Sequence, residues 1–139
     1  MKTGFALIMI VLPVAASASL YASPSSISFY GTVEGGRSIS QSTSVTNNGP
    51  EDARSVSVSH SCSLDYQVDA YSCNGPLAVY QSCRISVTHT PFREGYSSCQ
   101  IRVSSETSTT TIYVSGTAVK KREAPEQKPA EPRKVLKQI

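Results

Sequence analysis

Residues 55–62 carry the sequence Ser-Val-Ser-Val-Ser-His-Ser-Cys, in which every second residue is a serine. Successive side chains of a β-strand point to opposite faces, so a strand places Val56, Val58, His60 and Cys62 on one face and the serines on the other. In a helix the same four residues would fall on opposite sides. Residues 55–62 therefore predict a β-strand with one buried face.

The same alternation recurs between residues 24 and 119, where no segment has a helical repeat. Turn-forming sequences, such as Asn-Asn-Gly-Pro at residues 47–50, separate the alternating segments. The expected strands are residues 25–33, 38–46, 55–62, 66–70, 83–90, 98–104 and 109–118. Seven short strands without intervening helices predict an all-β, antiparallel immunoglobulin-like sandwich.

Four cysteines, Cys62, Cys73, Cys83 and Cys99, allow three pairings. In an immunoglobulin-like sandwich, the strands with Cys62 and Cys99 are antiparallel neighbours in one sheet. Cys73 and Cys83 bracket a short loop between two further strands. We therefore favour Cys62–Cys99 and Cys73–Cys83 disulfides, which would stabilise a thinly filled core. A metal site is disfavoured because the sequence has no C-x-x-C spacing.

The favoured Cys62–Cys99 pairing also fixes a strand register. It sets His60 opposite Ile101 and Val58 opposite Val103, so that residues of the two apolar faces meet. A slip of one residue would turn every one of these side chains to the other face.

The N-terminus has the pattern of a secretory signal peptide. Lys2 precedes an apolar run at residues 4–14, about half the ~20 residues that a membrane-spanning helix needs. Ala16-Ser17-Ala18 fits the small-residue rule for cleavage, and Leu20-Tyr21-Ala22 offers a second, poorer site. We expect residues 1–18 to be a signal peptide, with cleavage after residue 22 or a retained anchor as alternatives. The protein is then periplasmic or secreted, where disulfides persist.

Charge divides the rest of the chain at residue 120. Residues 24–119 hold five basic and seven acidic side chains, whereas residues 120–139 hold seven basic and three acidic ones. The net charge of +3 therefore describes a tail and gives no support for nucleic-acid binding. We expect a folded domain at residues 24–119 and a disordered, proline-rich tail at residues 120–139.

Four motifs in order carry a family resemblance. They are Ser-Ser-Ile-Ser-Phe at residues 25–29, Val-Thr-Asn-Asn-Gly at 45–49, Ser-Cys-Arg-Ile-Ser-Val-Thr-His-Thr-Pro at 82–91 followed by Gly95, and Val-Ser-Gly-Thr-Ala at 114–118. This order resembles the abnormal-spindle/hydin (ASH) type of immunoglobulin-like domain, which is related in fold to major sperm protein and is often found in bacterial exported proteins.

The resemblance implies a binding or scaffolding module without catalytic residues, and it does not name the partner. Cys73 and Cys83 lie where bacterial members often carry a cysteine pair. The sequence departs from the family at His89, where an aromatic residue is usual, and in its additional pair Cys62 and Cys99.

The candidate chemical groups favour structural roles. His60 and His89 fall on apolar strand faces, where we expect hydrogen-bonded histidines at the edge of the core. Asp65 and Asp69 share an outward face, and a calcium site would need more oxygen ligands. The sequence has no nucleophile-elbow or phosphate-binding glycine motif. We therefore expect no enzyme activity, no cofactor and no metal.

The tail and one loop remain as candidate partner-binding segments. The tail is either an unstructured terminus or a tether whose last five residues, including Val135, Leu136 and Ile139, add as a strand to a sheet edge. Its basic residues could also contact anionic lipid or cell-wall polymers weakly. Tyr80 is the one candidate anchor in the loop at residues 74–81.

Three functions are compatible with these features. We favour an exported interaction subunit of an envelope-associated assembly, such as a secretion, conjugation or motility apparatus, that binds protein partners through sheet edges and the tail. A fimbrial or surface-adhesive subunit is the alternative, and a secreted inhibitor module is a weaker one. The complete final strand and the short segment before Ser25 argue against assembly by donated strands.

Overall fold

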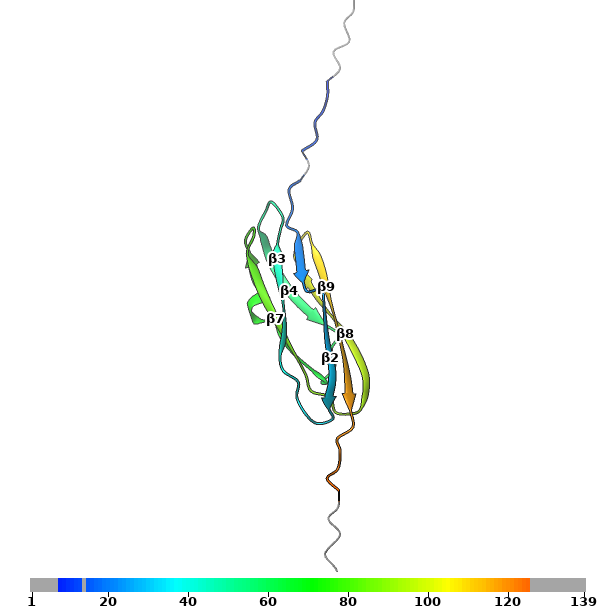
Figure 1. Ribbon diagram of the computed structural model, residues 1–139. Coiled ribbons are helices and arrows are strands. Elements are labelled where there is room, and N and C mark those ends of the chain that lie inside the picture. The colour runs from blue at the N-terminus through cyan, green and yellow to red at the C-terminus, as the bar shows by residue number, and fades with distance from the viewer. Residues whose placement is uncertain (1–7, 14, 126–139) are drawn as a thin grey trace, which may run out of the picture.

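The structure is a computed structural model and describes residues 8–13 and 15–125 of the chain. Two β-sheets pack face to face in an elongated body, and the N-terminal and C-terminal segments leave from opposite ends (Figure 1). We call these the N-terminal end and the basal end. The elements are β1 (Leu20–Ser23), β2 (Ser26–Val33), β3 (Gln41–Asn47), β4 (Ala53–His60), β5 (Tyr66–Asp69), the 3₁₀-helix η1 (Tyr71–Cys73), β6 (Gly75–Leu77), β7 (Ser82–His89), β8 (Gly95–Ser104) and β9 (Thr109–Val119).

The predicted all-β immunoglobulin-like sandwich is confirmed. One sheet has the strand order β1-β3-β7-β5 and the other the order β2-β9-β8-β4-β6. Strand β8 shows the expected alternation, with Cys99, Ile101 and Val103 buried and the residues between them exposed. Alternate side chains of both sheets form one core, whose fully buried members include Val45, Ile85, Val87, Ile101, Val103, Ile112 and Val114.

Both disulfides join the cysteines that the sequence favoured. Cys62, two residues after β4, is linked to Cys99 of β8, with their Cα atoms 4.8 Å apart. Cys73 of η1 is linked to Cys83 of β7, with a Cα–Cα distance of 5.1 Å. One link therefore lies within a sheet, and the other fastens the loop between β5 and β7 to the body.

The register between β4 and β8 is also the predicted one. Val58 lies opposite Val103, and His60 lies opposite Ile101. A slip of β4 by one residue would turn the buried Val56 away from the core and separate Cys62 from Cys99, so burial and the disulfide select the same pairing.

The structure differs from the sequence prediction in the number of strands and in one strand direction. The described residues contain nine strands, because Leu20–Ser23 and Gly75–Leu77 form two short ones. The first strand therefore begins at Leu20, ahead of the first predicted strand at residue 25. Strands β2 and β9 run parallel, although the prediction was wholly antiparallel. These strands lie far apart in the chain, so no hairpin turn fixes their relative direction.

Candidate interaction surface

Side chains of β3 reach the free edge of β2 and the residues just before it. Gln41 of β3 donates a side-chain hydrogen bond to the Ser28 carbonyl at 2.8 Å, and Thr43 donates one to the Pro24 carbonyl at 2.6 Å. Side chains of the opposite sheet thus occupy backbone acceptors at this edge. Proteins commonly cover sheet edges in this way, which prevents unwanted strand pairing.

The free edge of β5 carries an acidic residue at each end. Asp69 is exposed and accepts a hydrogen bond from the Tyr71 N–H at 3.2 Å. Asp65, just before the strand, is half-buried, which differs from the solvated position that the sequence predicted. A short edge with charged ends is a poor template for another strand.

Three loops meet at the basal end and are tied together by backbone hydrogen bonds. The Glu34 N–H donates to the Val119 carbonyl at 2.9 Å, and the Gly35 N–H donates to the Pro91 carbonyl at 2.8 Å. The Thr90 N–H donates to the Asp65 carbonyl at 2.7 Å. Because these bonds link different loops, the basal end is a connected surface rather than three independent loops.

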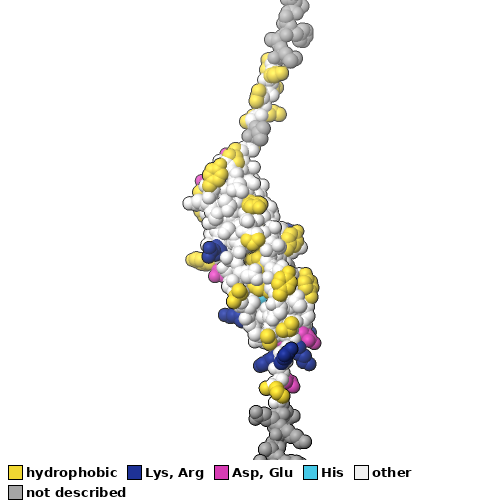
Figure 2. Space-filling view, in the orientation of Figure 1, with side chains coloured by type: hydrophobic (Ala, Val, Ile, Leu, Met, Phe, Trp, Pro, Cys, Tyr) yellow, Lys and Arg dark blue, Asp and Glu magenta, His cyan; other side chains and the backbone are white. Residues whose placement is uncertain are grey.

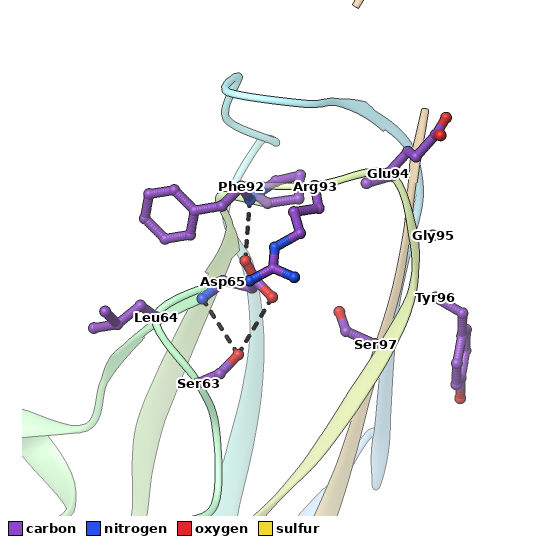
Figure 3. Close-up of a pocket in the computed structure, with 11 residues that line it drawn as sticks. Ser63, Leu64, Asp65, Phe92, Arg93, Glu94, Gly95, Tyr96 and Ser97 are labelled. Atoms are coloured by element: carbon purple, nitrogen blue, oxygen red, sulfur yellow. Dashed lines mark hydrogen bonds between the residues drawn. The ribbon is translucent and has the colours of Figure 1, made fainter. Parts of the chain in front are cut away.

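The Asp65 carboxylate fixes the centre of this surface (Figure 3). One oxygen accepts the Phe92 N–H at 3.0 Å, and the other accepts the Ser63 hydroxyl at 3.4 Å. Both contacts hold a loop in place and use oxygen atoms that a metal site would need. We therefore assign Asp65 a structural role, which positions Phe92.

Leu64 and Phe92 project from this scaffold into solvent, and Figure 3 shows both side chains on the same side of the loops. Their exposed fractions are 82% and 62%, whereas the adjacent Pro91 is buried. We call Leu64, Asp65, Pro91, Phe92 and Arg93 the basal surface. Hollows of about 460 and 510 Å³ adjoin it, and Leu64, Pro91 and Phe92 line both. Exposed apolar groups between shallow hollows are typical of an interaction surface.

Basic side chains surround the point where the chain leaves the basal end. Arg93 belongs to the basal surface, and Lys120, Lys121 and Arg122 follow β9 directly. Figure 2 shows a group of blue side chains at this end of the body, with a few acidic ones beside them. The basal end thus combines apolar and basic groups.

His89 lies in the core, between aromatic rings of both sheets. Its ring stacks on Tyr66 at a centroid distance of 4.9 Å and on Phe29 at 5.7 Å. Its Nδ1 lies 3.0 Å from the Thr32 hydroxyl, whereas Nε2 has no hydrogen-bond partner among the described residues. Burial lowers the pKa of His89 below its ordinary value of 6.5, and Asp65 opposes this shift weakly. The predicted core histidine is present, but only half of its ring is hydrogen-bonded.

His60 does not have the predicted position at the edge of the core. It pairs with Ile101 as expected, but its side chain is exposed because β4 ends at this residue. The described residues contain no cluster of three or more His, Cys, Asp or Glu side chains that could hold a metal ion.

The predicted partner-binding residues have different outcomes. Tyr80 is 79% exposed at the N-terminal end, and its N–H donates to the Asn47 carbonyl at 2.7 Å. The tail residues Val135, Leu136 and Ile139 lie outside the described part of the chain. Sequence analysis did not single out Leu64, Phe92 or Arg93. The available signal was a large aromatic residue directly after Pro91, in a loop that no strand pattern could bury.

Comparisons with solved structures identify the fold. The ASH/PapD-like domain of human CEP192 (PapD-like domain 7) has a TM-score of 0.59 and 14% identity, covering 88% of this chain and 99% of that one. The MSP-domain-like protein SSP-19 of Caenorhabditis elegans has a TM-score of 0.51 and 17% identity, covering 70% and 98%. The fold is thus that of an ASH/MSP-like immunoglobulin-like domain.

A third match concerns part of a larger protein. The Vibrio cholerae VesB protease has a TM-score of 0.51 and 18% identity over 70% of this chain, but over only 31% of the protease chain. This likeness shows a shared fold and carries no activity to the present chain. No protein-family model matches the sequence. No curated protein matches it either.

Two further observations concern the compartment. Two disulfides are compatible with an exported protein, because such bonds persist in oxidising environments. Among the residues that the structure describes, no helix is long and apolar enough to cross a membrane.

Proposed function

We propose that this chain is an exported, non-catalytic interaction module that binds a protein partner through its basal surface. The observation that carries the proposal is that the exposed Leu64 and Phe92 line the same two hollows, in loops that Asp65 holds together. Large apolar side chains at the centre of a patch supply most of the binding energy in protein interfaces.

Several features support a protein as the partner. Arg93 follows Phe92 directly, and Lys120–Arg122 follow β9 at the same end of the body; charged groups at the rim of an interface guide and orient binding. Side chains of β3 occupy backbone acceptors beside the β2 edge, and acidic residues flank β5, which favours contact through the loops over contact through these two edges. The segment after β9 starts beside the same surface and is placed to contribute to it.

The specific role that we propose is an accessory subunit of an envelope-associated assembly, such as a secretion, conjugation or motility apparatus. The alternative is a fimbrial or adhesive subunit that needs a donated strand. Strand β9 supports the first role over the second, because it already pairs with β8 along its length and with β2 at its other side.

The test is site-specific photo-cross-linking in the cells that produce the protein. A photoreactive residue at position 92 should yield a defined protein adduct, and one at Tyr71 should not. Tyr71 is a matched control because it is 91% exposed but lies on η1. The double variant Leu64→Ser/Phe92→Ser should lose the adduct formed by a probe at Arg93. Equal adducts from positions 92 and 71, or none from either, would contradict the proposal.

A further inference from the structure

The N-terminal segment changes abruptly from exposed to packed. Ile8, Met9, Ile10, Val11 and Leu12 are all between 78% and 85% exposed. Ala18, Leu20 and Ala22 are at most 7% exposed and belong to the core. An apolar run left in water is unfavourable, so residues 8–12 are not suited to remain beside the folded body. Ser17 is still exposed, and Ala18 is the first buried residue of the segment.

Strand β1 is an integral part of the sandwich. Its residues pair with β3 from Leu20 opposite Asn47 to Ser23 opposite Ser44. The Leu20 N–H also donates to the Ser108 hydroxyl at 2.9 Å, which links β1 to the start of β9. Removing β1 would expose one edge of β3 and the apolar residues that Leu20 and Ala22 cover.

The peptide bond between Ala18 and Ser19 is packed against a turn. The Ser19 N–H donates to the Asn47 Oδ1 at 3.1 Å, and the Ser19 carbonyl accepts the Asn48 N–H at 2.8 Å. A Cβ atom at Gly49 would lie 2.5 Å from the Ser19 nitrogen and 2.8 Å from the Ala18 carbonyl carbon. Only a glycine permits this approach, so the turn covers the bond closely.

We propose that an endopeptidase of the signal-peptidase class cleaves the Ala18–Ser19 bond before the domain folds, and that Ser19–Ser23 remain in the mature protein. The inference rests on the export that the proposed function includes. Ala16 and Ala18 supply the small residues that such an enzyme requires before the cut. Water adds across the bond, which leaves a carboxylate on Ala18 of the released leader and an ammonium group on Ser19.

Cleavage after Ala22 would give a product that lacks β1. A cut there would remove Leu20 and Ala22 and leave β3 as an open edge. A cut after Ala18 removes only one small buried side chain. It also converts the Ser19 N–H beside Asn47 Oδ1 into a charged donor, which strengthens that hydrogen bond.

The first test is the N-terminus of the exported protein, measured by intact mass and N-terminal sequencing of the full chain made in an exporting host. We expect a single species that begins at Ser19. Two outcomes would overturn the cleavage inference and leave the proposed function standing. One is a species that begins at Ser23, and the other is an exported, uncleaved chain that keeps Met1 and stays bound to the membrane. A chain that begins at Met1 in the cytoplasm with free thiols would overturn the proposed function itself.

The second test concerns the order of cleavage and folding. Full-length precursor, folded and oxidised in vitro, is incubated with purified signal peptidase in detergent micelles, beside precursor kept reduced and unfolded. We expect cleavage of the folded form to be at least about ten-fold slower, because it must wait for local opening. Equal rates would show that the turn does not protect the bond.

Gly49→Ala makes the second test specific. Its Cβ should push residues 17–19 out of place and restore cleavage of the oxidised precursor. Asn48→Ala is the matched control, because it keeps the backbone N–H that binds Ser19, and it should stay resistant. Circular dichroism shows whether Gly49→Ala retains the β-sandwich. Resistance of a folded Gly49→Ala precursor would overturn this account of the protection.

Discussion

At the residue scale, Asn47 holds the N-terminal end together. Its Oδ1 accepts the Ser19 and Gly49 N–H groups, at 3.1 and 3.0 Å. Its Nδ2 donates to the Glu51 and Leu77 carbonyls, at 2.8 and 3.1 Å. The side chain is fully buried and satisfied, so it fastens its own turn to the distant segments at Ser19 and Leu77 without an unpaired polar atom.

Replacing Asn47 tests this role. Asn47→Ala removes four hydrogen bonds, of which those to the Gly49 N–H and the Leu77 carbonyl are buried, so we expect the free energy of unfolding to fall by about 2–4 kcal/mol. Asn48→Ala, at an exposed neighbouring position, should change it by less than about 0.5 kcal/mol. Urea denaturation of both variants measures the difference, and equal losses would show that the buried network contributes little.

His89 makes stability depend on pH. The folded protein keeps this ring neutral because burial lowers its pKa, whereas the unfolded chain binds a proton near the ordinary value of 6.5. As the pH falls below about 6.5, the unfolded chain takes up a proton at this residue and the folded protein does not. The free energy of unfolding therefore decreases with falling pH, until the pH reaches the lower pKa of the folded protein. For this single residue, the decrease in the free energy of unfolding is at most about 1.4 kcal/mol per pH unit.

Denaturation curves at about pH 7.5 and pH 5.5 measure this effect. The decrease should persist in His60→Gln, because that side chain is exposed, and it should disappear in His89→Gln. An unchanged decrease in His89→Gln would assign the effect to another group.

At the element scale, strands with several alternating apolar residues were predictable and short ones were not. Residues 83–90 place four alternating side chains on the predicted inner face, and the bounds of the observed strand β7 differ from the predicted ones by one residue at each end. Leu20–Ser23 offers only two apolar residues on its inner face, and the preceding leader pattern obscured them. Residues 74–81 were expected to be a loop, although pairing with β4 makes Gly75–Leu77 the strand β6. Short strands depend on their neighbours more than on their own sequence.

The two disulfides should contribute unequally to stability. Cys62–Cys99 closes a sequence separation of 37 residues, and Cys73–Cys83 closes one of 10. Loop entropy then predicts losses of about 4 and about 3 kcal/mol when each pair is changed to alanine. Urea denaturation of the two double variants checks the order, and a larger loss for the short loop would point to packing around Cys73.

At the scale of the whole molecule, the candidate interaction surface was not predictable from sequence. Leu64 and Phe92 lie in different loops, which the pairing of β5 with β7 and the hydrogen bonds around Asp65 bring together. Sequence patterns locate buried faces, because burial imposes a period, but exposed loop residues follow no period. The sequence therefore directed attention to Tyr80, which the structure places at the opposite end.

The segment after β9 should not contribute to the stability of the body. Residues 120–125 are exposed and form no strand. We expect deletion of residues 120–139 to change the melting temperature by less than about 2 °C, while it weakens partner capture. Differential scanning calorimetry and the cross-linking assay measure the two effects. A fall of about 10 °C would show that this segment packs on the domain.

The placement of the two ends has a mechanical consequence. Tension applied between them would act along the strands, because the chain enters at one end of the body and leaves at the other. The parallel strands β2 and β9 share six paired positions, which such a pull would load simultaneously in shear instead of unzipping them in turn. A domain of this kind can resist stretching when its neighbours move apart.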